Sequence, residues 1–404
     1  MEMELSLSSR HPPAMTGDVA DFVLSHLPHL DGTAPAFVDA ATGGTLSFFA
    51  LRRAALSLAS GLRLGLGLRS GDAVLVLSHN SLLLPQILLG VLAAGGVVVA
   101  AEPDATPAEI AAAAHGSGAV IIVAAPEAAA KVAGVGVPLL LTSRSLDPRA
   151  LSAEELIDGG DPTALQPAAP SEPSGLAFLA YSSASRTVAM THADLVAAVA
   201  AASLPPDEAP RVCLASLPMC SAHGLPLIAL GLPAAGVTTV LVPPPSDPRA
   251  AREAVAAYGA TDVVAAPEAA AALAGPMALD AKLASLRRVT VAPTPFTPQA
   301  REEFRRKLPW VQLTEMEQAA QEAPAAELGG AQMLTHTDAA AVKVIQHDSQ
   351  PTEQMPATNE AASPVPPLKK IQKIILGDIF SRSTTSKILR KHPVAGNRRA
   401  VSKL

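Results

Sequence analysis

Short aliphatic runs that alternate with helix starts constrain the fold of this chain most strongly. The runs AVLVLSHN, VVVAA and AVIIV, between residues 71 and 130, predict strands, and helices are expected at 86–94 and after Thr106. Thr106 can cap the second helix, because Pro107 fits its first turn and Glu109 follows three residues later. Strands and helices that alternate in this way predict βαβ units in a wound, mostly parallel sheet.

A later segment repeats this pattern. The run VVAAPEAAAALAG from Val263 echoes IVAAPEAAAKVAG from Ile122, and each reads as a strand followed by an alanine-rich helix. The echo indicates either two related sheets in one large domain or a shared alanine-rich composition. Hydrophobic residues make up 49% of the chain and aromatic residues 3%, so the core consists mainly of aliphatic side chains, which suits helices covering parallel strands. We therefore expect an α/β fold, with wound sheets in a large amino-terminal domain and a small carboxyl-terminal α+β unit.

Charge and apolar patterning exclude some partners. A net charge of −6 gives no electrostatic reason to expect nucleic acid as a partner. The apolar segment from Leu82 to Ala101 is interrupted by Pro85, Gln86 and a glycine pair, which favours a buried helix, turn and strand over a membrane span. Two cysteines, Cys213 and Cys220, form no disulfide framework and read as small buried hydrophobic residues.

The carboxyl-terminal tripeptide predicts a location. Ser402, Lys403 and Leu404 match the address that the peroxisomal import receptor reads, and they follow a basic stretch. We therefore expect that receptor as a partner and the peroxisome as the location.

The stretch YSSASRTVAMTH, residues 181–192, predicts a strand, a polar loop, a second strand and a helix start. A triphosphate requires backbone N–H groups, hydroxyls and a cation at such a loop. Ser182, Ser183 and Ser185 supply hydroxyls and Arg186 a cation, but the loop has no glycine. An ordinary serine-rich turn is the alternative interpretation.

This stretch resembles the AMP-binding signature of the adenylate-forming family, which includes 4-coumarate:CoA ligases, acyl-CoA synthetases and luciferases. The signature runs approximately YSSGTTGxSKxVxxTHxNL, and this chain lacks GTTG after Ser183 and has Arg186 where the family has lysine. The resemblance implies a nucleotide-binding set made of Ser182, Ser183, Ala184, Ser185, Arg186, Thr191 and His192.

Two further segments extend the resemblance. LASLPMCSAHGLPL is similar to the family's LPMFHxYGL, which implies that His223 and Gly224 line the acid site; a polar loop between a strand and a helix is the alternative. Thr314 and Glu315 stand where the resemblance implies the end of a GYGxTE motif, whose threonine contacts phosphate and whose glutamate helps to hold Mg2+.

The segment VPPLKKIQKIILGDIFSRSTTSKILRK resembles the family's last motif, PYKKIxxVxFVDxIPRSxxGKILRR. Lys387 matches the family lysine that approaches the carboxylate and the α-phosphate, where a cation stabilises the developing negative charge. Ser386 replaces the glycine before it. A solvated basic tail is the alternative interpretation.

The resemblance also divides the chain. Residues 1–313 correspond to an incomplete AMP-binding large domain, 314–367 to a poorly ordered linker with a remnant of the small domain, and 368–404 to the last small-domain motif with the targeting tail. The blocks missing from the family pattern imply internal deletions.

The function implied is that of a 4-coumarate:CoA ligase-like enzyme of the plant peroxisomal type. Such an enzyme uses ATP, Mg2+ and coenzyme A to convert a hydroxycinnamate, fatty or jasmonate-type acid into its CoA thioester through an acyl adenylate. A catalytically inactive, truncated family member is the alternative, because the phosphate loop lacks GTTG.

Overall fold

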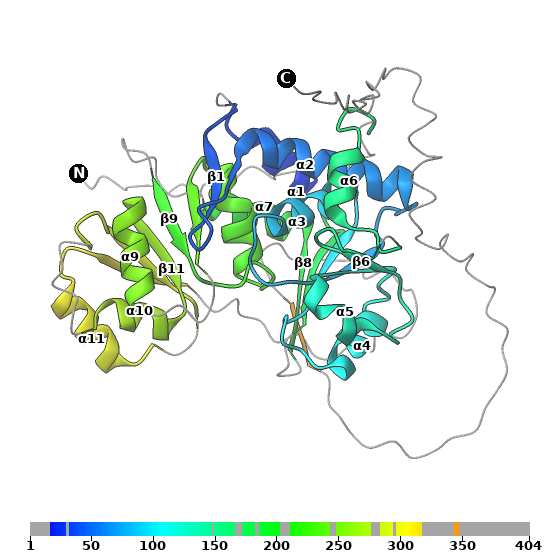
Figure 1. The fold of residues 1–404 in the computed structure, drawn as a ribbon. Helices are drawn as coiled ribbons and strands as arrows, with labels where there is room; N and C mark the ends of the chain where they lie inside the picture. Colours follow the sequence, from blue (N-terminus) through cyan, green and yellow to red (C-terminus); the bar gives the residue numbers. More distant parts are fainter. Residues whose placement is uncertain are drawn as a thin grey trace, which may run out of the picture.

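The computed structural model describes residues 17–29, 32–147, 149–165, 172–181, 186–202, 211–242, 248–275, 283–293, 296–316 and 343–346 (Figure 1). Of the predicted domains, 368–404 lies outside these ranges, and so does nearly all of 314–367. Strand β13 (Gln312–Glu315) runs across the predicted boundary between residues 313 and 314.

Helices and strands alternate along the described chain. The helices are α1 Val19–His26, α2 Phe48–Ser60, α3 Leu84–Ala93, α4 Pro107–Gly116, α5 Ala129–Val132, α6 Ala153–Gly159, α7 His192–Ala202, α8 Leu232–Ala234, α9 Pro248–Tyr258, α10 Pro267–Leu273 and α11 Pro298–Lys307. Shorter helical segments are η1 Gly61–Gly65, η2 Pro126–Ala128 and η3 Leu225–Gly231. The strands are β1 Pro35–Asp39, β2 Thr45–Ser47, β3 Ala73–Leu77, β4 Val97–Ala100, β5 Ile121–Ala124, β6 Leu139–Leu141, β7 Leu176–Tyr181, β8 Arg186–Thr191, β9 Val212–Ala215, β10 Thr238–Leu241, β11 Asp262–Ala265, β12 Arg288–Val291, β13 and β14 Lys343–Gln346.

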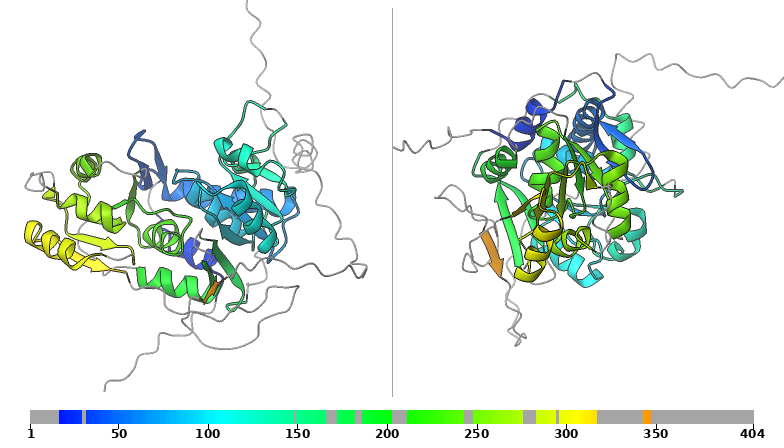
Figure 2. Two further views of the ribbon diagram at one scale, coloured as in Figure 1. Left: turned by 90° about the horizontal axis from the view of Figure 1, so that it is seen from below. Right: turned by 90° about the vertical axis from the view of Figure 1, so that its left-hand side faces the viewer.

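The described strands form two sheets. Sheet A has the order β13-β12-β11-β9-β10-β1-β2, and its strands are parallel except for the antiparallel pair of β1 and β2. Sheet B has the order β14-β8-β7-β4-β3-β5-β6, in which β8 pairs antiparallel with β7 and with β14, while the other neighbours are parallel. Both views of Figure 2 show β14 beside β8. The wound, mostly parallel α/β fold expected for the large domain is thus confirmed.

Helices cover both faces of both sheets, and alternate residues of the central strands β3, β4, β9 and β11 enter different cores. In β3, Val74 and Val76 belong to a large central core, whereas Leu75 and Leu77 belong to an outer core with Ile110 of α4. Sheet A divides in the same way, and its outer core includes Phe304 of α11. The central core contains residues from both sheets and from α1, α2, α3 and α7 (Figures 1 and 2). The layers are therefore helix, sheet, helix, sheet, helix.

The two sheets share one topology. Sheet B contains the strand order β4-β3-β5-β6 and sheet A the order β10-β9-β11-β12, so each unit winds first to one side of its opening strand and then to the other. The segment from Ile122 forms β5, η2 and α5, and the segment from Val263 forms β11 and α10. These elements hold corresponding places in the two units.

Local predictions agree with these elements. Thr106 caps α4, with Glu109 completing the reciprocal capping box. The apolar segment after Leu82 divides into α3 and β4. Among the described residues, every helix is too short or too polar to cross a bilayer. Both cysteines are unpaired, and burial raises the pKa of Cys220 to about 12.

Candidate functional site

The predicted phosphate loop lies in the sequence between β7 and β8, which pair antiparallel. Tyr181, the last residue of β7, pairs with Thr187, and β7 runs parallel to β4. The loop therefore leaves the carboxyl edge of sheet B, the edge at which wound sheets bind ligands. Residues 182–185 lie outside the described residues, and Arg186 is described by its backbone in β8. The predicted order of strand, loop, strand and helix is confirmed around them.

Thr191 caps helix α7. Its backbone N–H and hydroxyl both donate to Asp194 Oδ2, at 2.9 and 2.7 Å, and the Asp194 N–H donates back to Thr191 Oγ1 at 3.2 Å. This reciprocal arrangement satisfies N–H groups that the helix start leaves without partners. The structure thus places the Thr191 hydroxyl in a helix cap.

His192 lies against the start of α1. Its Nδ1 accepts the backbone N–H of Val19 at 3.3 Å and lies 3.8 Å from Asp18 Oδ2. The residue is 3% exposed. Burial lowers the pKa of His192, which favours the neutral form that this hydrogen bond requires. The structure thus gives His192 a packing role between α7 and α1.

The predicted acid-binding residues lie in a turn after β9. Ser221 Oγ donates to the Pro218 carbonyl at 2.8 Å and accepts the Gly224 N–H at 2.9 Å. A β-carbon at Gly224 would lie 1.8 Å from the Pro218 oxygen, so the turn closes only with glycine there. The turn leaves the carboxyl edge of sheet A, because β9 is parallel to β10 and β11.

His223 carries a buried nitrogen with no described partner. Its Nε2 is shielded from solvent and makes no hydrogen bond within the described part of the chain. Burial lowers the pKa of His223, so the ring is neutral at physiological pH. A buried polar atom without a partner costs about 1–3 kcal/mol, and a ligand that bonds to it would recover that energy.

Asn80, a residue that the motifs do not indicate, joins the two carboxyl edges. It follows β3, and its Nδ2 donates to the Leu217 carbonyl at 2.8 Å while its Oδ1 accepts the Met219 N–H at 2.8 Å. Leu217 and Met219 belong to the loop that carries His223. The candidate site therefore lies where the loops after β3 and β9 meet, beside the edge from which the phosphate loop leaves.

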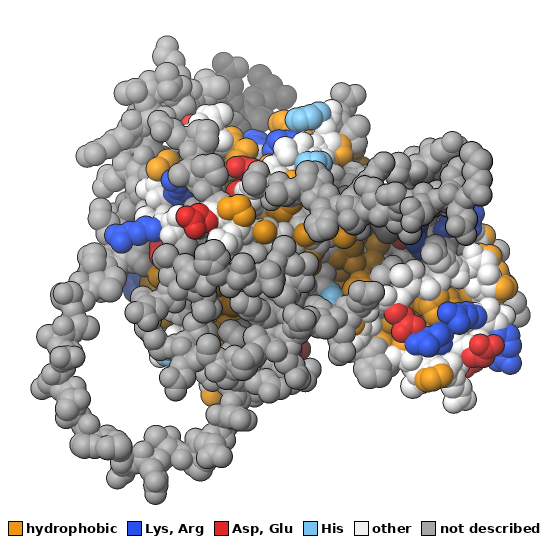
Figure 3. Space-filling model, turned by 180° about the vertical axis from the view of Figure 1, so that it is seen from behind, with side chains coloured by type: hydrophobic (Ala, Val, Ile, Leu, Met, Phe, Trp, Pro, Cys, Tyr) orange, Lys and Arg blue, Asp and Glu red, His pale blue; other side chains and the backbone are white. Residues whose placement is uncertain are grey.

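Thr314 and Glu315 lie on β13, at the described edge of sheet A. Arg301 of α11 donates from Nη2 to Glu315 Oε2 at 2.9 Å, and its Nε lies 2.6 Å from Oε1 in an ion pair. On the face shown in Figure 3, acidic and basic side chains are interspersed over the right-hand part of the molecule. The described residues contain no cluster of three His, Cys, Asp or Glu side chains able to hold a metal ion. Lys387 and the tripeptide Ser402, Lys403 and Leu404 lie outside the described residues.

The fold and the candidate site thus define the class: an α/β protein with two wound sheets whose carboxyl edges are linked by Asn80. The family described as AMP-binding enzyme matches residues 29–319. The chain therefore belongs to the AMP-binding enzyme family.

Curated relatives and solved structures agree with this membership. The chain is 33% identical to "4-coumarate–CoA ligase-like 3" of rice (Oryza sativa subsp. japonica) and 30% identical to "Peroxisomal OPC-8:0-CoA ligase 1" of Arabidopsis thaliana. Each match covers 75% of this chain and 57% of the relative, so the chain spans little more than half the length of these relatives. A benzoate CoA ligase structure from Burkholderia xenovorans has the same fold, with a TM-score of 0.64, 23% identity and coverage of 74% of this chain and 60% of that one.

Proposed function

We propose that this chain is an ATP-dependent acid:CoA ligase that acts through an acyl adenylate. The observation that carries the proposal is the meeting of the two sheet edges, because it brings the His223 turn beside the sheet from which the predicted phosphate loop leaves. Relatives named as CoA ligases support the same reaction.

The reaction assigns a role to each part of the site. The acid's carboxylate oxygen attacks the α-phosphorus of ATP, and pyrophosphate leaves; the thiolate of coenzyme A then attacks the acyl carbon, and AMP leaves. Residues 182–186 would bind the phosphates, and His223 and Gly224 would contact the acid. The Lys387 ammonium would stabilise the charge that develops on the α-phosphate.

Mg2+ accompanies ATP in this proposal, and Glu315 would be its protein ligand. The Glu315 carboxylate is exposed and pairs with Arg301 of α11. An exposed ion pair contributes about 0–1 kcal/mol, so a bound Mg2+ ion could replace it.

The substrate class proposed is a hydroxycinnamate or a fatty or jasmonate-type acid. The names of the relatives, which include 4-coumarate and OPC-8:0, support these classes. A neutral, buried His223 favours an acid that presents a hydroxyl or carbonyl oxygen to Nε2.

ATP–pyrophosphate exchange with a panel of such acids tests the proposal. We expect exchange with at least one acid, and we expect Lys387→Ala to abolish it while Lys391→Ala, a neighbouring lysine, leaves it unchanged. A folded protein that is silent with every acid would contradict the proposal.

An inactive family member is the second candidate, and the absence of GTTG after Ser183 favours it. Each hydrogen-bond donor missing from a charged phosphate oxygen costs about 1.5–3 kcal/mol. Inserting GTTG after Ser183 separates the candidates. A gain of ATP binding in calorimetry would show that the shortened loop limits this chain, whereas equal binding before and after insertion favours the competent enzyme.

We propose the peroxisome as the location, through Ser402, Lys403 and Leu404. The name of the peroxisomal Arabidopsis relative supports this. A fluorescent protein fused to the amino terminus should enter peroxisomes and stay outside them when Leu404 is deleted; equal import of both fusions would contradict the proposal.

A further inference from the structure

Asn80 occupies a distinctive place in the fold. It follows β3, the opening strand of the sheet B unit, whose neighbours on either side are β4 and β5. The loop that it binds follows β9, the opening strand of the matching unit in sheet A. Ligands of wound sheets bind where the chain winds to opposite sides of such a strand. Asn80 therefore links the two positions at which this fold presents ligand sites.

The link also sets a distance. In sheet B, β4 separates β3 from β7, the strand that leads into residues 182–185. Neighbouring strands lie about 4.8 Å apart, so β3 lies about 10 Å from β7. The bonds of Asn80 thus hold the start of the loop after β9 at β3, about 10 Å from β7.

We propose that Asn80 is the positioning residue that holds the His223 turn at the acid site. The inference rests on the proposed function and adds a residue that acts through the turn, without touching the acid. Three residues separate Met219 from His223. Ser221, one of these three, closes the turn by donating to the Pro218 carbonyl and accepting the N–H of Gly224. The bonds to Leu217 and Met219 hold the start of this short segment on sheet B.

The two hydrogen bonds of Asn80 to Leu217 and Met219, here called the clamp, require an amide side chain. Nδ2 donates to a carbonyl and Oδ1 accepts an N–H, so a residue at this position must supply one donor and one acceptor. An ionised aspartate supplies two acceptors and repels the Leu217 oxygen. A protonated aspartic acid again supplies one donor and one acceptor, so Asn80→Asp should regain the clamp as the pH falls.

Kinetics of the full chain test the positioning role. We expect Asn80→Asp to raise KM for the acid at least about tenfold at pH 8, the equivalent of one lost hydrogen bond, with KM for ATP within about twofold of wild type. The ratio of variant to wild-type KM should shrink towards pH 5.5. The control is Ser285→Ala, which removes a 3.0 Å bond to the Ala260 carbonyl at the opposite, amino edge of sheet A and should leave both KM values unchanged.

Hydrogen exchange provides a readout that needs no activity. In Asn80→Ala, which removes the acceptor of the Met219 N–H, the Met219 amide should exchange at least about tenfold faster than in wild type. Unchanged protection of Met219 overturns the inference, as does lost protection with an unchanged KM for the acid. If wild type gives no ATP–pyrophosphate exchange, the proposed function has failed; the Kd of 4-coumarate, by calorimetry, then replaces KM, and equal Kd values for variant and wild type overturn the inference.

Discussion

Two histidines show how burial and hydrogen bonding assign different roles to one residue type. His192 is neutral, buried and bonded to the first turn of α1. His223 is also neutral, but its Nε2 has no partner among the described residues. The first arrangement stabilises packing, and the second leaves a polar atom available to a ligand.

Replacing each ring by phenylalanine should therefore have opposite effects. We expect His223→Phe to raise the free energy of unfolding of the ligand-free protein by about 1 kcal/mol, because the unpaired Nε2 disappears. His192→Phe should lower that free energy by about 1–3 kcal/mol, because the Val19 N–H loses its acceptor. Urea denaturation measures both. Equal losses in the two variants would show that Nε2 of His223 has a partner.

Stability should also depend on pH through His192. Its pKa in the folded protein is lowered, so between that value and the ordinary value of about 6.5 the unfolded chain binds more protons. The contribution of the neutral ring is complete above about pH 6.5 and is lost as the pH falls through that window. We expect His192→Asn, which keeps an acceptor but does not titrate, to lose less stability than wild type between pH 7.5 and 5 in urea denaturation. Parallel pH curves for the two proteins would contradict this role.

At the scale of elements, the turn between β9 and η3 depends on close backbone approach. Gly224→Ala would bring a β-carbon to 1.8 Å from the Pro218 oxygen, so the backbone must move. We expect a loss of about 1–3 kcal/mol in unfolding free energy, typical of overpacking, together with weaker binding of the acid. Gly65→Ala is the matched control, because a β-carbon there meets no atom within 4 Å. Denaturation and calorimetry would disprove the steric argument if both variants behaved alike.

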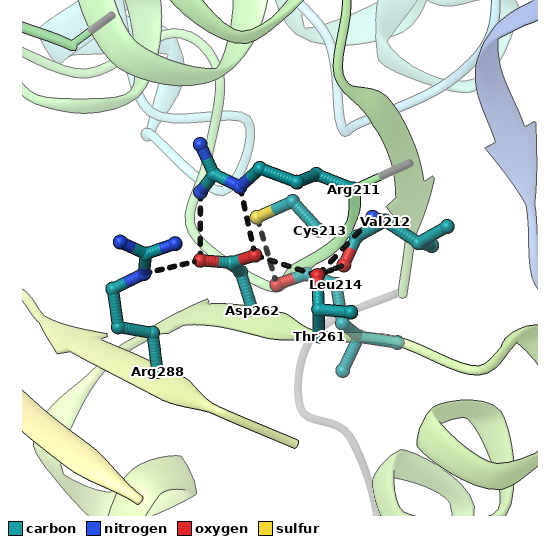
Figure 4. A network of polar contacts seen from close by, with 7 residues as sticks. All are labelled: Arg211, Val212, Cys213, Leu214, Thr261, Asp262 and Arg288. Atoms are coloured by element: carbon teal, nitrogen blue, oxygen red, sulfur yellow. Dashed lines mark hydrogen bonds and ion pairs between the residues drawn. The ribbon is translucent and has the colours of Figure 1, made fainter. Parts of the chain in front are cut away.

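At the scale of the whole molecule, a buried charge network stabilises the edge of sheet A opposite the site. Asp262, at the start of β11, accepts from Arg211 Nη2 and from Arg288 Nε, both at 2.8 Å, and from the Thr261 hydroxyl at 2.7 Å (Figure 4). Burial alone would raise the pKa of Asp262, but these donors outweigh it, and the pKa is lowered. The carboxylate thus joins the starts of β9, β11 and β12.

Asp262→Ala should strongly destabilise the fold without touching the site. Two largely buried guanidinium groups lose this carboxylate, and removing one partner of a buried pair costs about 3–5 kcal/mol. Thermal unfolding measures the loss, and Lys307→Ala, which breaks an exposed pair with Glu303, should cost about 0–1 kcal/mol. A small loss in Asp262→Ala would show that the network contributes little.

Local signals in the sequence predicted much of this architecture. Aliphatic runs predicted β3, β4 and β5, the cap at Thr106 predicted α4, and the break after Leu82 predicted α3 with β4, because these signals lie within one turn or one strand. The phosphate motif specifies the order of residue types along the chain. This order does not reveal that Thr191 caps α7 or that His192 contacts α1.

The sequence by itself determined the family, the wound α/β fold and the order of loop, strand and helix around residues 181–192, since each depends on neighbours along the chain. The tertiary structure alone decided that Asn80 binds a loop 137 residues away, that Arg301 pairs with Glu315, and that His223 is left without a described partner. Such contacts form only when segments distant in the sequence pack against each other. The identity of a side chain does not indicate which distant group it will contact.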